Sequence, residues 1–106
     1  MPSGATVRPQ KWDNVIDLYD NGVNSAIWGN YDGSSNRCLG VRCNGNDADE
    51  PYGYPNQSGN PLWYVEPDFV TRQILFSLLC ELAKNTSLQG RQVYQQNILV
   101  ALSECR

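Results

Sequence analysis

The 106-residue chain contains no histidine. Histidine is the commonest general base and the usual partner of a serine or cysteine nucleophile, so the familiar triad and dyad arrangements are excluded. Glycine-rich phosphate loops of the Walker type and dinucleotide-binding fingerprints are also missing, because the glycines stand in turn sequences or alone. These absences argue against the commonest classes of hydrolase and of nucleotide-dependent enzyme.

Charge of either sign is scarce. Lysine and arginine number 8, aspartate and glutamate 11, and the formal net charge is -3. The cations are scattered singly along the chain, whereas a nucleic-acid surface needs a basic stripe that displaces counterions from phosphates. The balance is also too mildly acidic to imitate DNA. We therefore expect no nucleic-acid partner.

Long apolar runs are absent too. No stretch approaches the roughly 20 apolar residues that span a bilayer, and residues 1–11, MPSGATVRPQK, lack the apolar segment of a secretory signal. We expect a flexible segment over 1–11, a single domain over 12–106, no membrane partner and a cytoplasmic location.

The four cysteines should stay reduced in the cytoplasm. Cys38 and Cys43 lie five residues apart, which puts them on opposite faces of a strand and prevents a disulfide between them. Cys80 and Cys105 form no second close pair, and histidine is missing. We therefore expect neither a metal site nor a cofactor.

What the chain does contain is a series of short runs rich in β-branched and aromatic residues, separated by turn sequences. The run VIDLY precedes Asp20-Asn21-Gly22, whose Asn and Gly tolerate positive φ, and this predicts a hairpin. A helix ending at Gly22 is the alternative, because the apolar residues of 12–19 also fall at helical spacing. We favour the strand because the run is short and branched.

Two further strands are predicted at 25–31 and 37–43, joined by the polar loop DGSSN. Gly29 and Gly40 fall in the middle of these strands. A missing side chain at such a position allows the close approach of an aromatic ring, a bulge or a ligand. We expect a packed ring at both.

Residues 44–60 form a long polar connection of a length that is often functional in compact domains. A fourth short strand is predicted at 61–66, where Pro67 ends it, and helices are predicted at 68–84 and 91–104. The expected fold class is therefore α+β: an antiparallel meander of three to four strands followed by two helices packed on one face.

The first predicted helix is apolar on two adjacent faces and must be covered on two sides. One cover is the sheet, and the other is the last helix or a second subunit. Phe69, Phe76 and Cys80 on the second face are the predicted interface residues if a second subunit covers them.

Aromatic residues crowd the long loop and the strand after it. Tryptophan and tyrosine supply contact area at low entropy cost, and with carboxylates nearby they also hold cations. The residues predicted to form a ligand site are Tyr52, Tyr54, Trp63, Tyr64, Asp49 and Glu50. Trp63 is better explained as a core residue, whereas the loop tyrosines are harder to explain in that way.

Three functions remain open. The leading hypothesis is a non-enzymatic binding or interaction module with its site at the 44–64 loop, and a specific version of it is a small-molecule pocket between that loop and the first helix. The second is a protein–protein module, either a homodimer or an inhibitor of a host or phage protein. The third is a carboxylate-based enzyme, for which the sequence offers no pair of ionisable groups at a recognisable spacing and no catalytic residue.

The segments LYDNG, AIWGNYDG, RCLGVRCNG and GYPNQSGNPLWYVEPDF, followed by two helices, resemble small bacterial proteins of mobile elements, of the integron gene-cassette type. The resemblance spans residues 12–106. It implies an accessory, adaptive cytoplasmic protein that is often oligomeric. It carries over no catalytic residue, since no activity is assigned to such proteins.

Overall fold

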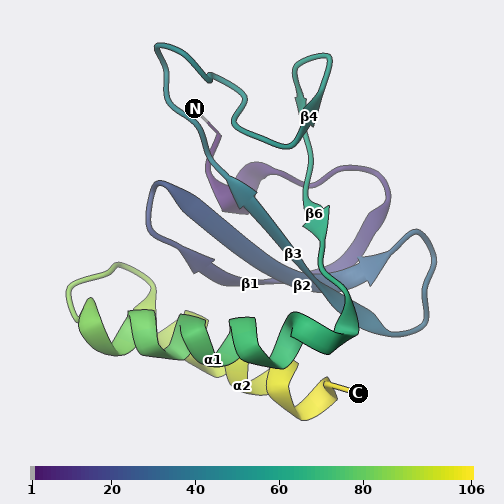
Figure 1. Ribbon diagram of the computed structural model, residues 1–106, viewed down its shortest axis with the longest axis vertical. Helices are drawn as coiled ribbons and strands as arrows, with labels where there is room; N and C mark the ends of the chain where they lie inside the picture. The colour runs from purple at the N-terminus through teal and green to yellow at the C-terminus, as the bar shows by residue number, and fades with distance from the viewer. Residues whose placement is uncertain (1) are drawn as a thin grey trace.

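In the computed structural model, which describes residues 2–106, two helices cover one face of a four-stranded antiparallel sheet (Figure 1). The strand order is β1-β2-β3-β6. The elements are η1 (Gly4–Thr6), β1 (Trp12–Asp20), β2 (Asn24–Tyr31), β3 (Arg37–Cys43), β4 (Asn56–Gln57), β5 (Asn60–Pro61), β6 (Tyr64–Val65), α1 (Asp68–Lys84) and α2 (Arg91–Glu104). The predicted α+β fold, with a meander followed by two helices, is confirmed.

The region around residues 12–20 is a strand and not a helix. β1 pairs antiparallel with β2 from Trp12 opposite Tyr31 to Asp20 opposite Ser25, with two register shifts. The second shift lies around Leu18 and places two successive residues, Leu18 and Tyr19, in the core. A bulge inserts one extra residue and breaks the alternation of faces. The bulges therefore account for the helix-like spacing of the apolar residues.

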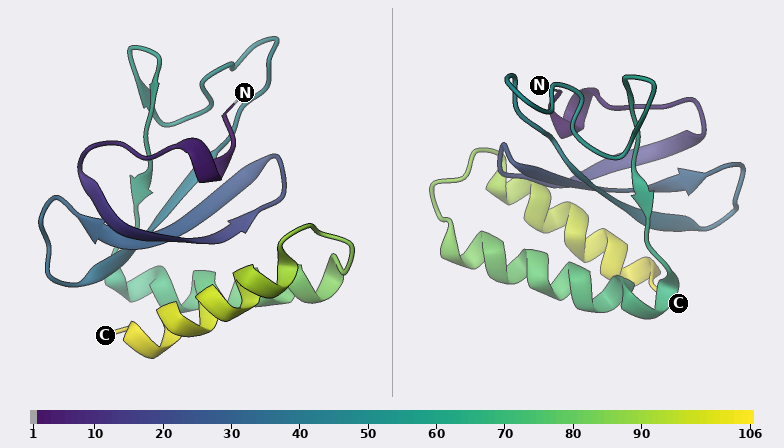
Figure 2. Two further views of the ribbon diagram at one scale, coloured as in Figure 1. Left: turned by 180° about the vertical axis from the view of Figure 1, so that it is seen from behind. Right: turned by 45° about the horizontal axis from the view of Figure 1, so that its top comes forward.

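Both faces of the sheet are covered. The helix side carries the larger core cluster, which includes Leu39, Leu75 and Ile98. On the other side, across which the N-terminal segment runs (Figure 2), lies a second cluster that includes Val7, Trp12 and Trp63.

The N-terminal segment, which we expected to be flexible, packs against the sheet. Val7 is buried beneath Trp63, whose indole Nε1 donates to the Val7 carbonyl at 2.9 Å. The Gly4 amide donates to the Asp20 carboxylate at 2.9 Å, and Arg8 pairs with Asp17 at 2.8 Å. The sequence did not show this because a single apolar residue among polar ones has no periodicity.

The Trp12 ring packs against both mid-strand glycines. A Cβ on Gly40 would lie 3.0 Å from Trp12 Cη2, and one on Gly29 would lie 3.3 Å from Trp12 Cε3. The expected packed ring is therefore confirmed at Gly40. Gly29 lies opposite the first register shift of β1, and a Cβ there would come closest to Val15 Cγ2, at 2.8 Å, so an irregularity of the neighbouring strand contributes as well as the ring.

All four cysteines are free thiols. Among residues 2–106, neither helix has the length and apolar character needed to cross a bilayer.

Candidate functional site

The long loop returns to the sheet at Tyr54. The Cys43 amide donates to the Tyr54 carbonyl at 2.9 Å, and the Tyr54 amide donates to the Cys43 carbonyl at 3.0 Å. Directly opposed residues of an antiparallel pair point their side chains to the same face. The Tyr54 ring therefore lies beside Cys43 on the helix side of the sheet, and a side-chain hydrogen bond with Cys43 raises the pKa of the Tyr54 phenol.

Arg42 fixes the same loop from the opposite face of β3. Its side chain is buried and donates to the carbonyls of Leu62 (2.6 Å), Pro55 (3.3 Å) and Tyr52. The guanidinium carbon lies 5.9 Å from the centroid of a Trp63 ring. Burial lowers the pKa of Arg42, and its Nε is a buried donor with no partner. The guanidinium thus satisfies the loop carbonyls of Tyr52 and Leu62 and shares the Pro55 carbonyl with the Leu62 amide.

A cavity of about 500 Å³ lies where the loop, the ends of β2 and β3, and α1 meet. We call it the Tyr54 cavity. Its lining consists of Tyr19, Asn21, Asn24, Ser25, Ala26, Val41, Arg42, Cys43, Tyr54, Leu78 and Glu81. Apolar side chains from two strands and one helix are joined there by phenol, amide, thiol and carboxylate groups.

The lining of the cavity contains two charged residues, Arg42 and Glu81. Successive β3 side chains alternate between the two faces, so Val41 and Cys43 point toward the helices and Arg42 points away. On the face away from the helices, the Arg42 guanidinium donates a hydrogen bond to the Leu62 carbonyl. The Glu81 carboxylate lies on the helix side, 3.6 Å from the exposed amine of Lys84. Asp20 stands between the lining residues Tyr19 and Asn21 in the sequence but does not itself line the cavity. Its carboxylate accepts hydrogen bonds from the backbone amides of Gly4 and Gly22 and from the side-chain amide of Asn44.

The structure divides the six predicted ligand-site residues. Tyr54 and Tyr64 both pair with β3 along the edge that faces away from β2, Tyr54 with Cys43 and Tyr64 with Val41. Only Tyr54 of the six lines the Tyr54 cavity. Trp63 is 5% exposed and belongs to the core of the other face.

The remaining three predicted residues do not line the cavity, although the charge of Glu50 helps to raise the pKa of the Tyr54 phenol. The Tyr52 ring packs near Gly59, in the part of the loop that contains β4 and β5. Asp49 and Glu50 belong to a turn that Asn46 closes, by accepting the Asp49 amide at 2.7 Å and donating its own amide to the Glu50 carbonyl at 2.9 Å.

Sequence reasoning missed most of the cavity's lining. Leu78 and Glu81 come from the helix, and Asn21 and Asn24 from the first hairpin turn. Leu78 reads as an ordinary core position of an amphipathic helix, and Asn21 as a turn residue. No sequence pattern signals that these elements leave a gap between them.

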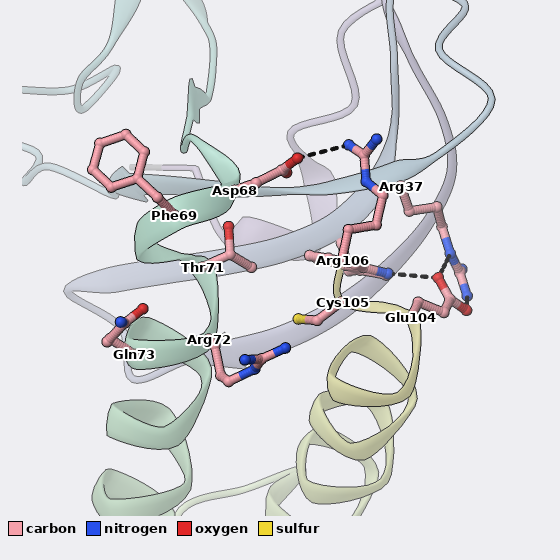
Figure 3. Close-up of a pocket in the computed structure, with 10 residues that line it drawn as sticks. Arg37, Asp68, Phe69, Thr71, Arg72, Gln73, Glu104, Cys105 and Arg106 are labelled. Carbon is pink, nitrogen blue, oxygen red and sulfur yellow. Dashed lines mark hydrogen bonds and ion pairs between the residues drawn. The ribbon is translucent and has the colours of Figure 1, made fainter.

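A second, smaller cavity of about 140 Å³ lies at the other end of the helix layer (Figure 3). Glu104 there accepts from Arg37 and, at 2.7 Å, from the Trp28 indole, while Arg106 pairs with Asp68 at 2.8 Å. The hydrogen bonds from Arg37 and Trp28 lower the pKa of Glu104 to about 2. Because these bonds connect the end of α2 to the sheet, we assign the cluster to stability.

We expect Glu104→Gln to reduce stability at neutral pH by roughly 0.5–1 kcal/mol, a small effect because the exposed part of the pair is screened by solvent. The folded-state pKa lies below the ordinary value of 4.5, so the contribution of the charge is present above pH 4.5 and lost as the pH falls toward 2. Urea unfolding across that range should show the two proteins converging in acid. Glu81→Gln, which removes only an exposed ion pair, is the control and should change stability little.

The fold and the cavity define a small one-domain α+β protein with a pocket at one end of its sheet–helix interface. No family model matches the chain, and no curated protein or solved structure is significantly similar to it. The resemblance to proteins of integron gene cassettes therefore stays a prediction.

Proposed function

We propose that this protein is a non-enzymatic binding module that holds a small molecule in the Tyr54 cavity. The observation that carries the proposal is the cavity itself. Its volume of about 500 Å³ falls within the range of roughly 300–1,000 Å³ typical of ligand sites. Its position between the long loop and the first helix is the one that the sequence analysis favoured.

The lining supports a ligand with an apolar body and a cationic group. Ala26, Val41 and Leu78 supply an apolar floor. Glu81 supplies the negative charge, and the Tyr54 ring offers a π-face that attracts cations. A small primary or quaternary amine bearing an alkyl or aryl group matches these features, and an organic acid does not.

A thermal-shift comparison tests this ligand class. The probes are short alkyl and arylalkyl amines, the neutral alcohols of the same carbon skeleton, and the matching carboxylates. Amines should raise Tm saturably, because binding to the native state alone stabilises it by about 2.7 kcal/mol at one hundred times Kd. Alcohols should act more weakly and carboxylates not at all. Equal shifts from all three series, or no shift from the amines, would contradict the proposal.

Tyr54→Ala should weaken binding of the best amine about tenfold, which corresponds to about 1.4 kcal/mol of lost ring contact. The Tm of the free protein should change little, since the side chain is 48% exposed and the bonds to Cys43 are made by the backbone. Calorimetric titration of the variant measures the loss.

Tyr52→Ala is the matched control for this experiment. Tyr52 lies in the same loop and is 51% exposed, but it does not line the cavity. Its substitution should leave amine affinity unchanged. If both variants lose affinity equally, the ligand site lies elsewhere on the loop, and a large loss of stability in Tyr54→Ala would identify that ring as structural.

A further inference from the structure

The two helices turn a largely apolar surface away from the sheet, on a side different from the Tyr54 cavity. Phe69 is 79% exposed, and Phe76 and Leu99 are each 52% exposed. Cys80 is exposed as well. The sequence left open whether the last helix covers the second apolar face of the first, and in the structure α2 packs beside α1 and leaves these residues uncovered (Figure 2).

This surface, which we call the outer helix face, is also nearly free of charge. Apart from Glu104, which pairs with Arg37, the exposed residues of α2 are all neutral: Gln92, Val93, Gln95, Gln96, Leu99, Val100 and Ser103. The outward residues of α1 between Arg72 and Lys84 are likewise neutral: Gln73, Phe76, Ser77, Cys80 and Ala83. A solvated helix usually carries charged residues on its outward side.

We propose that the outer helix face binds a second copy of this chain about a two-fold axis, so that two helix layers meet between two outer sheets. A two-fold interface places identical patches against each other, so it requires a patch that does not repel itself. An uncharged face meets this requirement. It also offers no charge with which to select a partner of opposite sign, and this favours a second copy over a different protein.

The arrangement of the face matches that of known interfaces. Phe76 and Leu99 each lie near the middle of their helix, and exposed glutamines and serines precede and follow them along the two helices. Interfaces are depleted in charge at the centre, carry aromatic anchors there and are polar at the rim.

The available area suffices for a reversible dimer. Helices of 17 and 14 residues are about 25 and 21 Å long at a rise of about 1.5 Å per residue. Side by side they present a footprint of roughly 500 Å² per copy, or about 1,000 Å² for the pair, which reaches the lower limit for specific interfaces. We therefore expect a dimer that dissociates on dilution.

Sedimentation velocity over a concentration series, from low micromolar to sub-millimolar, tests the proposal. The average mass of the wild type should rise from 11.9 kDa toward twice that value and stop there. Phe76→Glu and Leu99→Glu should each raise the dissociation constant at least about thirtyfold. Circular dichroism should show both variants folded, because each substitution is made at a half-exposed position.

Val23→Glu is the matched control, because it makes the same kind of change at a valine that is 58% exposed in the first hairpin turn. It should dimerise like the wild type. A wild type that stays monomeric throughout the series, glutamate variants that still dimerise, or a Val23→Glu variant that does not would each overturn the proposal.

Discussion

Substituting Gly53 with alanine should destabilise the protein by about 3 kcal/mol, the sum of a strained backbone and a steric clash. Gly53 has φ of +63°, which L-residues rarely adopt. An added Cβ would overlap the Cys43 carbonyl oxygen and lie 2.5 Å from Arg42 Nη2. Both neighbours belong to the joint that holds the loop on β3. Chemical denaturation measures the loss, which should also lower Tm by more than about 10 °C.

Gly33→Ala separates the two causes. Gly33 also has a left-handed backbone, with φ of +78°, but a Cβ there would meet no atom within 4 Å. The expected cost is about 1 kcal/mol, from the backbone alone. Equal losses in the two variants would show that the loop moves aside at Gly53 without cost and that its joint with β3 is loose.

The fold was predictable because its elements are local in sequence. Turn sequences bracket β2 and β3, and the bounds predicted for α1 and α2 match the structure. In both helices, apolar residues recur at helical spacing along the whole element, and the pattern stops only at the two ends. By contrast, β6 contains only Tyr64 and Val65 of the six residues expected in that strand, since the flanking residues turn toward Arg42 and the helix.

β1 shows where periodicity fails. A regular strand alternates, but two register shifts within nine residues place apolar side chains at irregular intervals. The same amino-acid sequence is then compatible with a helix as well as with a strand. Only the pairing with β2, which is a tertiary property, decides between them.

The candidate site was predictable only in part. The composition of the loop drew attention to Tyr54, which lines the cavity, but the cavity depends on the pairing of Tyr54 with Cys43 across ten intervening residues. The polar segment between these two residues shows no alternation of apolar and polar side chains, so the sequence does not indicate which residue of the loop pairs with Cys43. The contributions of Leu78 and Glu81 depend on how the helix packs, which no local pattern specifies.

Arg42 is the residue on which the shape of the long loop depends most. It is 3% exposed and has no carboxylate partner among residues 2–106, so its charge is compensated by three carbonyl groups and an indole face. An isolated buried charge is expensive unless such groups are arranged around it. Those carbonyls belong to residues 52–62, so without the guanidinium the loop has little to hold it to β3.

Arg42→Met should therefore cost about 2–4 kcal/mol. The methionine keeps an apolar stem, but the carbonyls of Tyr52 and Leu62 lose their side-chain donor, at roughly 1–3 kcal/mol for each one that stays buried, whereas the Pro55 carbonyl keeps the Leu62 amide as a donor. Removal of a desolvated charge with an unpaired Nε offsets part of that loss.

Hydrogen exchange distinguishes release of the loop from general unfolding. The Tyr54 amide, bonded to Cys43, and the Leu62 amide, bonded to Pro55 at 2.9 Å, should exchange faster than amides of α1 in Arg42→Met under native conditions. Arg72→Met is the control, since Arg72 is an exposed helix residue, and it should leave both rates unchanged. If Arg42→Met accelerated hydrogen exchange equally at helix and loop amides, Arg42 would stabilise the whole fold and not the loop in particular. The sheet alone would then hold the loop residues that line the Tyr54 cavity.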